Sequence, residues 1–282
     1  MHPTKHAKNL RVHYSRLMSM WLPVLVLSLK VIAPLGAAEP QVKVQQPDAE
    51  RVSADTEQME DNDRPANLPT GINDGFLNPE MDPEEYIQRF EVESREVFAC
   101  RQQILKALEL HEGLSVADIG AGTGLFMKAL SQSVGQQGRV YAVEIAPSFV
   151  KHLRTRARVE GLDNVEVVFC SDRNANLPKN SVDRLFICDV YHHFEYPALT
   201  MQSLYDAMRE GGILVLVDFH REPNNVNPER REWLRGHVRA PLEVFRQEIE
   251  QAGFRFKDEV AVEGFLENYL LRFVKPSADQ AK

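Results

Sequence analysis

Hydrophobic residues follow two different periods along the chain, and the change comes near residue 115. From residue 84 to about Leu110, apolar side chains recur at three- and four-residue steps, which is typical of an amphipathic helix. Asp82 and Pro83 stand just ahead of this stretch, where an aspartate can cap a helix and a proline suits the first helical position. We therefore expect a long helix that begins near residue 83 and ends near Leu110.

After residue 115, short apolar runs alternate with stretches of helical periodicity. The apolar runs cover 115–119, 139–144, 165–169, 182–188, 212–218, 254–262 and 266–274. The helical stretches cover 124–133, 146–160, 195–209 and 241–252. This alternation predicts an α/β fold, a doubly wound and mostly parallel sheet, in one domain over 84–275 with a short tail at 276–282.

The first 83 residues differ in composition from the rest. Residues 1–38 hold five Lys or Arg and no acid, and their apolar second half ends in small residues. That order predicts a secretory signal peptide and export, for example to the periplasm. A membrane anchor through 17–35, or a cytoplasmic protein with a later start, stays open as an alternative. Residues 39–83 hold eleven acids against three basic residues and show no sustained periodicity, which predicts a disordered acidic linker.

Charge and cysteine content narrow the function classes. The net charge is −8 at pH 7, so the chain lacks the basic character that neutralises phosphates, and we expect no nucleic-acid partner. Cys100, Cys170 and Cys188 each stand among apolar residues, and three such cysteines imply no disulfide framework.

A glycine-rich turn joins the first apolar run to the next helical stretch. Residues 120–124 read Gly-Ala-Gly-Thr-Gly, which brings bare backbone to a helix N-terminus, where a polar ligand group binds. Glu144 ends the second run, twenty residues after the last glycine, and a carboxylate there can accept hydrogen bonds from ribose hydroxyls. The spacing is not the G-x-G-x-x-G of dinucleotide sites, and no Tyr-x-x-x-Lys pair follows residues 182–188. A nicotinamide-dependent oxidoreductase is therefore the less favoured alternative.

Residues 116–124 closely resemble motif I of class I S-adenosylmethionine-dependent methyltransferases, and the resemblance extends over 84–275. The small-molecule methyltransferases of ubiquinone and menaquinone biosynthesis are the nearest type. Membership would imply a seven-stranded sheet in the order 3-2-1-4-5-7-6 with the last strand antiparallel, and S-adenosylmethionine as cofactor.

The resemblance also implies a set of cofactor-binding residues. These are Asp118, Gly120, Ala121, Gly122, Thr123, Gly124, Glu144, Ile145, Asp172 and Asp189. Asp118 and the glycine backbone would receive the methionine moiety, and Glu144 the ribose. Asp172 would receive the adenine amino group, provided that one residue is inserted before Leu177-Pro178 relative to the family pattern.

Titratable and aromatic residues gather after the fourth and fifth apolar runs. A methyltransferase has to hold its acceptor in line with the methyl group and, where required, remove a proton. The candidates for these roles are Tyr191, His192, His193, His237 and Arg239. We favour His193 as the base, because it shares a direction with Tyr191 if the extended conformation continues past the fourth run.

No metal site is expected. His192, His193, Glu195, Asp218 and His220 include suitable ligand types, but adjacent histidines on such a turn usually diverge. The sequence therefore predicts a methyltransferase that acts on a small-molecule or lipid-like acceptor. A binding protein that keeps the cofactor pocket but performs no chemistry is the alternative from another class.

Overall fold

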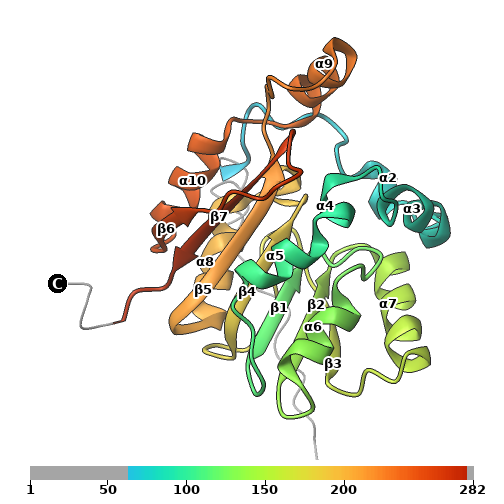
Figure 1. Ribbon diagram of the computed structural model, residues 1–282, viewed down its shortest axis with the longest axis vertical. Helices are drawn as coiled ribbons and strands as arrows, with labels where there is room; N and C mark the ends of the chain where they lie inside the picture. Colours follow the sequence, from blue (N-terminus) through green and yellow to red (C-terminus); the bar gives the residue numbers. More distant parts are fainter. Residues whose placement is uncertain (1–62, 278–282) are drawn as a thin grey trace, which may run out of the picture. The chain divides into compact units, whose positions relative to one another are not determined.

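The computed structural model describes residues 63–277 (Figure 1). The expected signal or anchor segment at 1–38 and the linker residues 39–62 lie outside the described residues. Within the described part, no helix is both long enough and apolar enough to cross a membrane. Cys100, Cys170 and Cys188 are free thiols.

A seven-stranded sheet forms the centre of the described domain, in the order β3-β2-β1-β4-β5-β7-β6 (Figure 1). Its strands are β1 (Ser115–Ile119), β2 (Arg139–Glu144), β3 (Val165–Phe169), β4 (Val182–Cys188), β5 (Met208–Phe219), β6 (Arg255–Glu259) and β7 (Asn268–Val274). The pairs from β3 across to β5 are parallel, and β7 is antiparallel to both of its neighbours. The expected fold class and strand order are confirmed.

Helices cover both faces of the sheet because the buried strands are apolar on both sides. The helices that follow the strands are α6 (Met127–Val134), α7 (Pro147–Val159), α8 (Pro197–Ala207), α9 (Pro228–His237) and α10 (Leu242–Gln251). One core cluster joins Leu204 of α8 and Phe245 of α10 to the sheet, and another joins Ile104 and Leu130 to the opposite face. The sheet is therefore closed off from water except along its edges and ends.

The long helix expected from residue 83 to Leu110 is wrong in one respect, because the chain leaves the helix twice. It forms α3 (Pro83–Phe90), α4 (Glu96–Ala99) and α5 (Arg101–Ala107), and Asp82 caps α3 as predicted, with Oδ1 3.0 Å from the amide nitrogen of Glu84. The break between α3 and α4 frees Arg95 to reach Asp189 and lets Glu96 bind the backbone ahead of β7. The bonds to these distant partners stabilise the broken helix more than continuous helical hydrogen bonding would.

The disordered linker expected over 39–83 is wrong for residues 63–83, which belong to the domain. They include the short helix α2 (Asp74–Leu77), and they bury Leu68 and Met81. Their polar side chains bind distant parts of the chain: Arg64 pairs with Glu195, and Asn67 donates to the backbone oxygen of Arg239. Composition alone misses such an element, because its order comes from contacts with residues far along the sequence.

Candidate active site

A cavity of about 660 Å³ lies beyond the carboxyl ends of β1, β2, β4 and β5. Its volume is in the range of small-molecule and cofactor pockets. The lining includes the glycine turn and Glu144, and it also includes the imidazoles of His192, His193 and His237. Both halves of the site expected from the sequence therefore face one cavity.

The glycine turn after β1 needs glycine for two different reasons. Gly120 and Gly122 have φ values of +69° and +53°, a left-handed conformation that side chains disfavour. A Cβ on Gly120 would lie 2.6 Å from Cγ2 of Val190, whereas one on Gly122 would meet nothing nearer than 3.8 Å. Gly124 is also left-handed, with φ +82°, and in addition it permits close helix packing, since its Cβ would approach Leu153 of α7 at 2.9 Å. Gly124 does not line the cavity, unlike Gly120 and Gly122.

Glu144, at the end of β2, is buried and holds the glycine turn. Its Oε2 accepts from the amide nitrogen of Gly122, and its Oε1 accepts from those of Ile145 and Ala146, each at 2.8 Å. Burial raises the pKa of Glu144, and these three backbone bonds lower it. A carboxylate has about four lone-pair sites, so one is left for a ligand hydroxyl. Binding both hydroxyls of a ribose requires one of these backbone bonds to give way.

Asp118, on β1, is a second buried carboxylate on the cavity wall. Burial raises its pKa to about 7, and the nearby charge of Glu144 adds to this shift. Its side chain has no hydrogen-bond partner among residues 63–277. A cationic or hydrogen-bond-donating group of a ligand would satisfy it.

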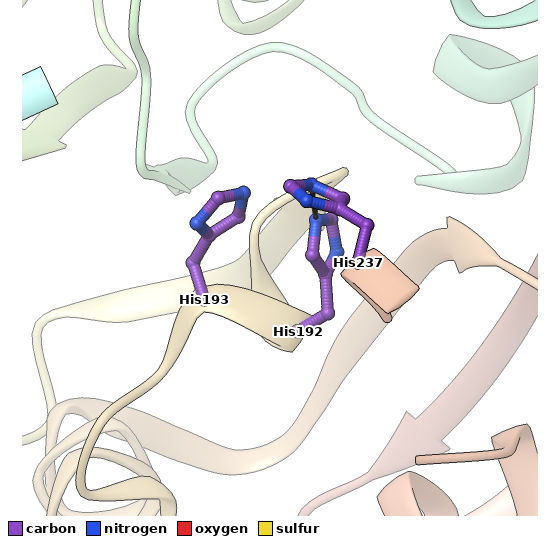
Figure 2. Close-up of side chains that lie close together, drawn as sticks. All are labelled: His192, His193 and His237. Carbon is purple, nitrogen blue, oxygen red and sulfur yellow. Dashed lines mark hydrogen bonds between the residues drawn. The ribbon is translucent and has the colours of Figure 1, made fainter. Parts of the chain in front are cut away.

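Three histidines meet where the short 3-10 helix η2 (Tyr191–His193) follows β4, close to the end of α9 (Figure 2). Nδ1 of His192 lies 2.6 Å from Oδ1 of Asp218, and its Nε2 lies 3.2 Å from Nε2 of His237. Nδ1 of His193 lies 3.0 Å from Oδ1 of Asn73. Burial lowers the pKa of His192 to about 3 and that of His237 to about 4, and it holds the pKa of His193 well below its usual range. All three imidazoles are therefore neutral at pH 7.

Comparison with known proteins identifies the domain. A family model described as "Methyltransferase domain" matches residues 117–216. A S-adenosylmethionine-dependent methyltransferase from Aquifex aeolicus is 28% identical with a TM-score of 0.59, and the match covers 69% of this chain and 98% of that one. The chain carries a class I S-adenosylmethionine-dependent methyltransferase domain. The family expected from residues 116–124 is thereby confirmed.

Curated relatives match over a shorter stretch. A demethylmenaquinone methyltransferase of Geobacillus stearothermophilus is 22% identical over 118 residues, which is 42% of this chain and 50% of the relative. A protein-L-isoaspartate O-methyltransferase of Methanococcoides burtonii is 29% identical over 110 residues, which is 39% of this chain and 51% of the relative. The chain thus spans about half the length of these relatives.

The residues of this methyltransferase domain fit its cofactor, S-adenosylmethionine. Glu144 keeps a lone pair for a ribose hydroxyl, Asp118 is an unpaired carboxylate for a cationic amino group, and the glycine turn offers bare backbone. Of the residues expected to bind it, the following also line the cavity: Ala121, Thr123, Ile145, Asp172 and Asp189. Their individual contacts with the cofactor stay predictions.

Two of the expected acceptor residues lie away from the cavity. The fully buried Tyr191 donates its hydroxyl to Glu248 at 3.1 Å, and Nη1 of Arg239 lies 2.8 Å from the same carboxylate. We expected Tyr191 to share a direction with His193, but the chain turns into η2 after β4, and the two side chains diverge. Only the three histidines of the expected set face the acceptor space. The role of His193 as a base stays a prediction. Its lowered pKa would make this imidazole a weak base.

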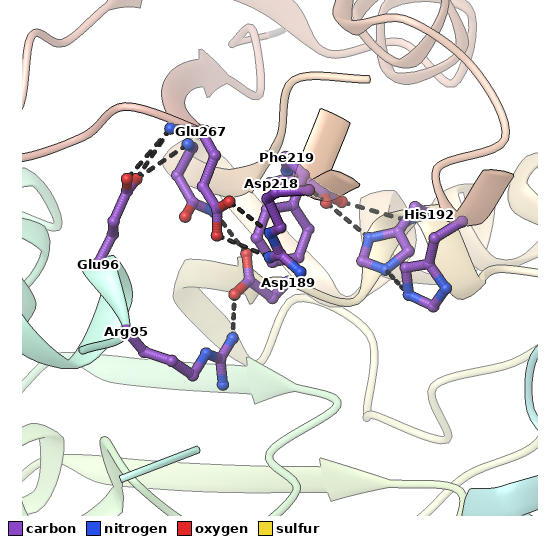
Figure 3. Close-up of polar contacts among 10 residues, drawn as sticks. Arg95, Glu96, Asp189, His192, Asp218, Phe219 and Glu267 are labelled. Atoms are coloured by element: carbon purple, nitrogen blue, oxygen red, sulfur yellow. Dashed lines mark hydrogen bonds and ion pairs between the residues drawn. The ribbon is translucent and has the colours of Figure 1, made fainter. Parts of the chain in front are cut away.

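The sequence did not indicate a network of ion pairs and hydrogen bonds, drawn in Figure 3, whose members Arg95, Asp189 and Glu267 line the cavity. Arg95 pairs with Asp189, which also accepts from Nδ2 of Asn268 at 2.7 Å. Burial raises the pKa of Asp189 to about 7, and Arg95 opposes that shift. Glu96 accepts from the amide nitrogens of Glu267 and Asn268. The start of α4 is thereby joined to the start of β7.

Three further lining residues come from segments without a sequence signal. Asn73 and Phe76 belong to α2 and its cap, inside the expected linker, and Trp233 belongs to α9, whose polar composition hides its helical period. Phe76 meets the ring of His193 edge-on at 5.4 Å, and Trp233 stacks on His237 at 4.3 Å. These segments complete the walls around the histidines.

Proposed function

We propose that this chain transfers the methyl group of S-adenosylmethionine to a small, largely apolar acceptor that enters the same cavity. The bound cofactor supplies a sulfonium methyl group that an acceptor takes by in-line displacement. The observation that carries the proposal is that one cavity contains both the glycine turn with Glu144 and the histidine cluster. Such an arrangement places two ligands next to each other and excludes water from between them.

The aromatic lining of the cavity supports an apolar and planar acceptor. Aromatic side chains from five different parts of the fold contribute to it: Phe76, Phe90, Phe194, Phe219 and Trp233. Aromatic faces stack on flat rings and remove apolar surface from water. The segments that carry Phe76 and Trp233, α2 and α9, stand at the end of the sheet where the strands finish (Figure 1).

The names of the relatives offer two acceptor classes. One relative is named for demethylmenaquinone, whose methylated part is a flat quinone ring, and the other for a protein isoaspartyl residue. The aromatic lining of this cavity favours the first class. The net charge of −8 gives no support to a nucleic-acid acceptor.

The test is a transfer assay with methyl-labelled S-adenosylmethionine. We expect label in a small hydroquinone or phenol acceptor, and none in an isoaspartyl peptide. Glu144→Ala should weaken cofactor binding and so lower the rate in the same assay. Label in the peptide alone would contradict the small-acceptor proposal. Cofactor binding without transfer to any acceptor would favour a non-catalytic binding protein.

A further inference from the structure

We propose that His192, His193 and His237 form a binding site for a divalent transition metal ion, with Zn²⁺ as the best fit. One ligand nitrogen from each histidine lies within 4.8 Å of the other two. The imidazoles converge from two elements, η2 and the end of α9, as Figure 2 shows. The expectation that neighbouring histidines diverge at this turn is wrong, because His192 and His193 have ring centroids only 4.3 Å apart.

The spacing of the nitrogen atoms suits a tetrahedral ion. With Zn–N bonds of about 2.0–2.1 Å, two ligands of a tetrahedral site lie about 3.3–3.4 Å apart. Nε2 of His192 and Nε2 of His237 are 3.2 Å apart, close to this value. The ligand nitrogens of all three histidines lie within 4.8 Å of one another, so metal binding requires the third imidazole to move toward the other two. Two ligands are thus nearly in place.

The surroundings of the histidines resemble those of metal ligands. A ligating histidine usually donates its other ring N–H to a carboxylate or carbonyl oxygen. Nδ1 of His192 lies 2.6 Å from Oδ1 of Asp218, and Nδ1 of His193 lies 3.0 Å from the side-chain oxygen of Asn73 (Figure 3 shows the first pair). These partners place the hydrogen on Nδ1 and leave the lone pair of Nε2 for a metal. His237 is oriented by stacking on Trp233.

The ligand set selects the kind of ion. Imidazole nitrogen suits Zn²⁺ and its neighbours in the first transition row, whereas Mg²⁺ and Ca²⁺ require oxygen ligands. Three protein ligands leave a fourth position open, as in catalytic rather than structural zinc sites. Because all three histidines line the cavity, that position faces the acceptor space. It would take a water molecule or an oxygen or sulfur atom of a ligand.

The experiment uses the full-length chain without an affinity tag, stripped of metal by a chelator and titrated with Zn²⁺ and with Co²⁺. We expect one ion per chain, the visible absorption of tetrahedral Co²⁺, and a melting temperature that rises with Zn²⁺. Asp218→Asn should weaken binding roughly 10- to 100-fold, as loss of an outer partner does. His237→Ala and His237→Gln should weaken it further, because each removes a ligand.

His111→Ala is the matched control. His111 is exposed and lies outside the cavity, so its loss should leave metal affinity unchanged. Absence of stoichiometric binding by the wild type would overturn the proposal. A metal affinity equal to that of the wild type in both His237 variants would also overturn it, provided that each variant melts at the wild-type temperature without metal. Calorimetry with S-adenosylmethionine on the same stripped protein separates this proposal from the proposed function, because the cofactor residues lie outside the histidine cluster.

Discussion

The carboxylate of Asp218 and the imidazole of His192 form a buried pair, with Oδ1 and Nδ1 2.6 Å apart. Asp218 also accepts from the amide nitrogens of His192, at 3.1 Å, and Phe219, at 2.7 Å. The pair thereby joins the end of β4 to the end of β5. It fixes the direction in which His192 presents Nε2 to the cavity.

Asp218→Ala should therefore destabilise the protein strongly. The substitution leaves the donors of His192 and Phe219 buried without a partner, and each buried donor left unsatisfied costs about 1–3 kcal/mol. Urea denaturation, followed by circular dichroism, measures the free energy of unfolding. Asp218→Asn keeps an acceptor oxygen and should lose less. Equal losses in the two variants would contradict a role that depends on the hydrogen bonds.

Gly120→Ala and Gly122→Ala should differ in their effect on stability, but both should weaken cofactor binding. A Cβ at Gly120 collides with Val190, whereas one at Gly122 meets only the strain of a left-handed backbone, which costs about 1–2 kcal/mol. We expect Gly120→Ala to lower the melting temperature more than Gly122→Ala does. Both should weaken cofactor binding, since both put a methyl group on the backbone that faces the cavity. Calorimetry that showed full affinity in Gly122→Ala would remove this turn from the cofactor site.

Cofactor binding should strengthen as the pH rises towards 7. Burial first, and the charge of Glu144 second, raise the pKa of Asp118 to about 7, so this carboxyl is largely protonated at pH 5.5. A cationic amino group binds the ionised form, so affinity should rise by up to about tenfold per pH unit below 7 and then level off. Without cofactor, the raised pKa has the opposite effect on folding, and its stabilisation is lost as the pH rises through about 7.

Asp118→Asn provides the control for this pH dependence. Asparagine does not titrate, so calorimetry between pH 5.5 and 8 should give a shallower pH profile than that of the wild type and a weaker affinity throughout. A slope as steep as that of the wild type would assign the titration to another group.

The sequence indicates those parts of this fold that depend on local pattern. The sequence predicts the strand Ser115–Ile119 and the position of Glu144 at the end of the next strand, because a buried strand is apolar along its whole length. Arg95 was placed inside a helix, since nothing local reveals a partner 94 residues away at Asp189. His237 stands at the end of α9, which buries only Leu234 and so has no clear apolar period. The sequence thus names the three histidines as candidates, but their convergence on one point appears only in three dimensions.

Asn73→Ala should show that residues 63–83 belong to the domain. Nδ2 of Asn73 donates to the backbone oxygen of His193 at 3.1 Å and to Oε1 of Glu195 at 2.9 Å. Losing these bonds and the contact with Nδ1 of His193 should lower the free energy of unfolding by about 1–3 kcal/mol. Limited proteolysis should then cut this segment sooner than in the wild type.

Arg64→Ala is the matched control in the same segment. Its ion pair with Glu195 is exposed, and such pairs contribute about 0–1 kcal/mol. A loss of stability in Arg64→Ala as large as that in Asn73→Ala would contradict the specific role of Asn73 at the histidines.

Calorimetric titration of S-adenosylmethionine into the full chain and into Glu144→Ala measures whether the glycine turn and Glu144 bind the cofactor. The wild type should bind one equivalent. The variant should bind roughly 10- to 150-fold more weakly, because hydrogen bonds to a charged acceptor contribute about 1.5–3 kcal/mol. Since Glu144 also holds three backbone amides, the titration is made well below the melting temperature of the variant. No binding by the folded wild type, or the same affinity in both proteins, would show that the glycine turn and Glu144 do not bind the cofactor.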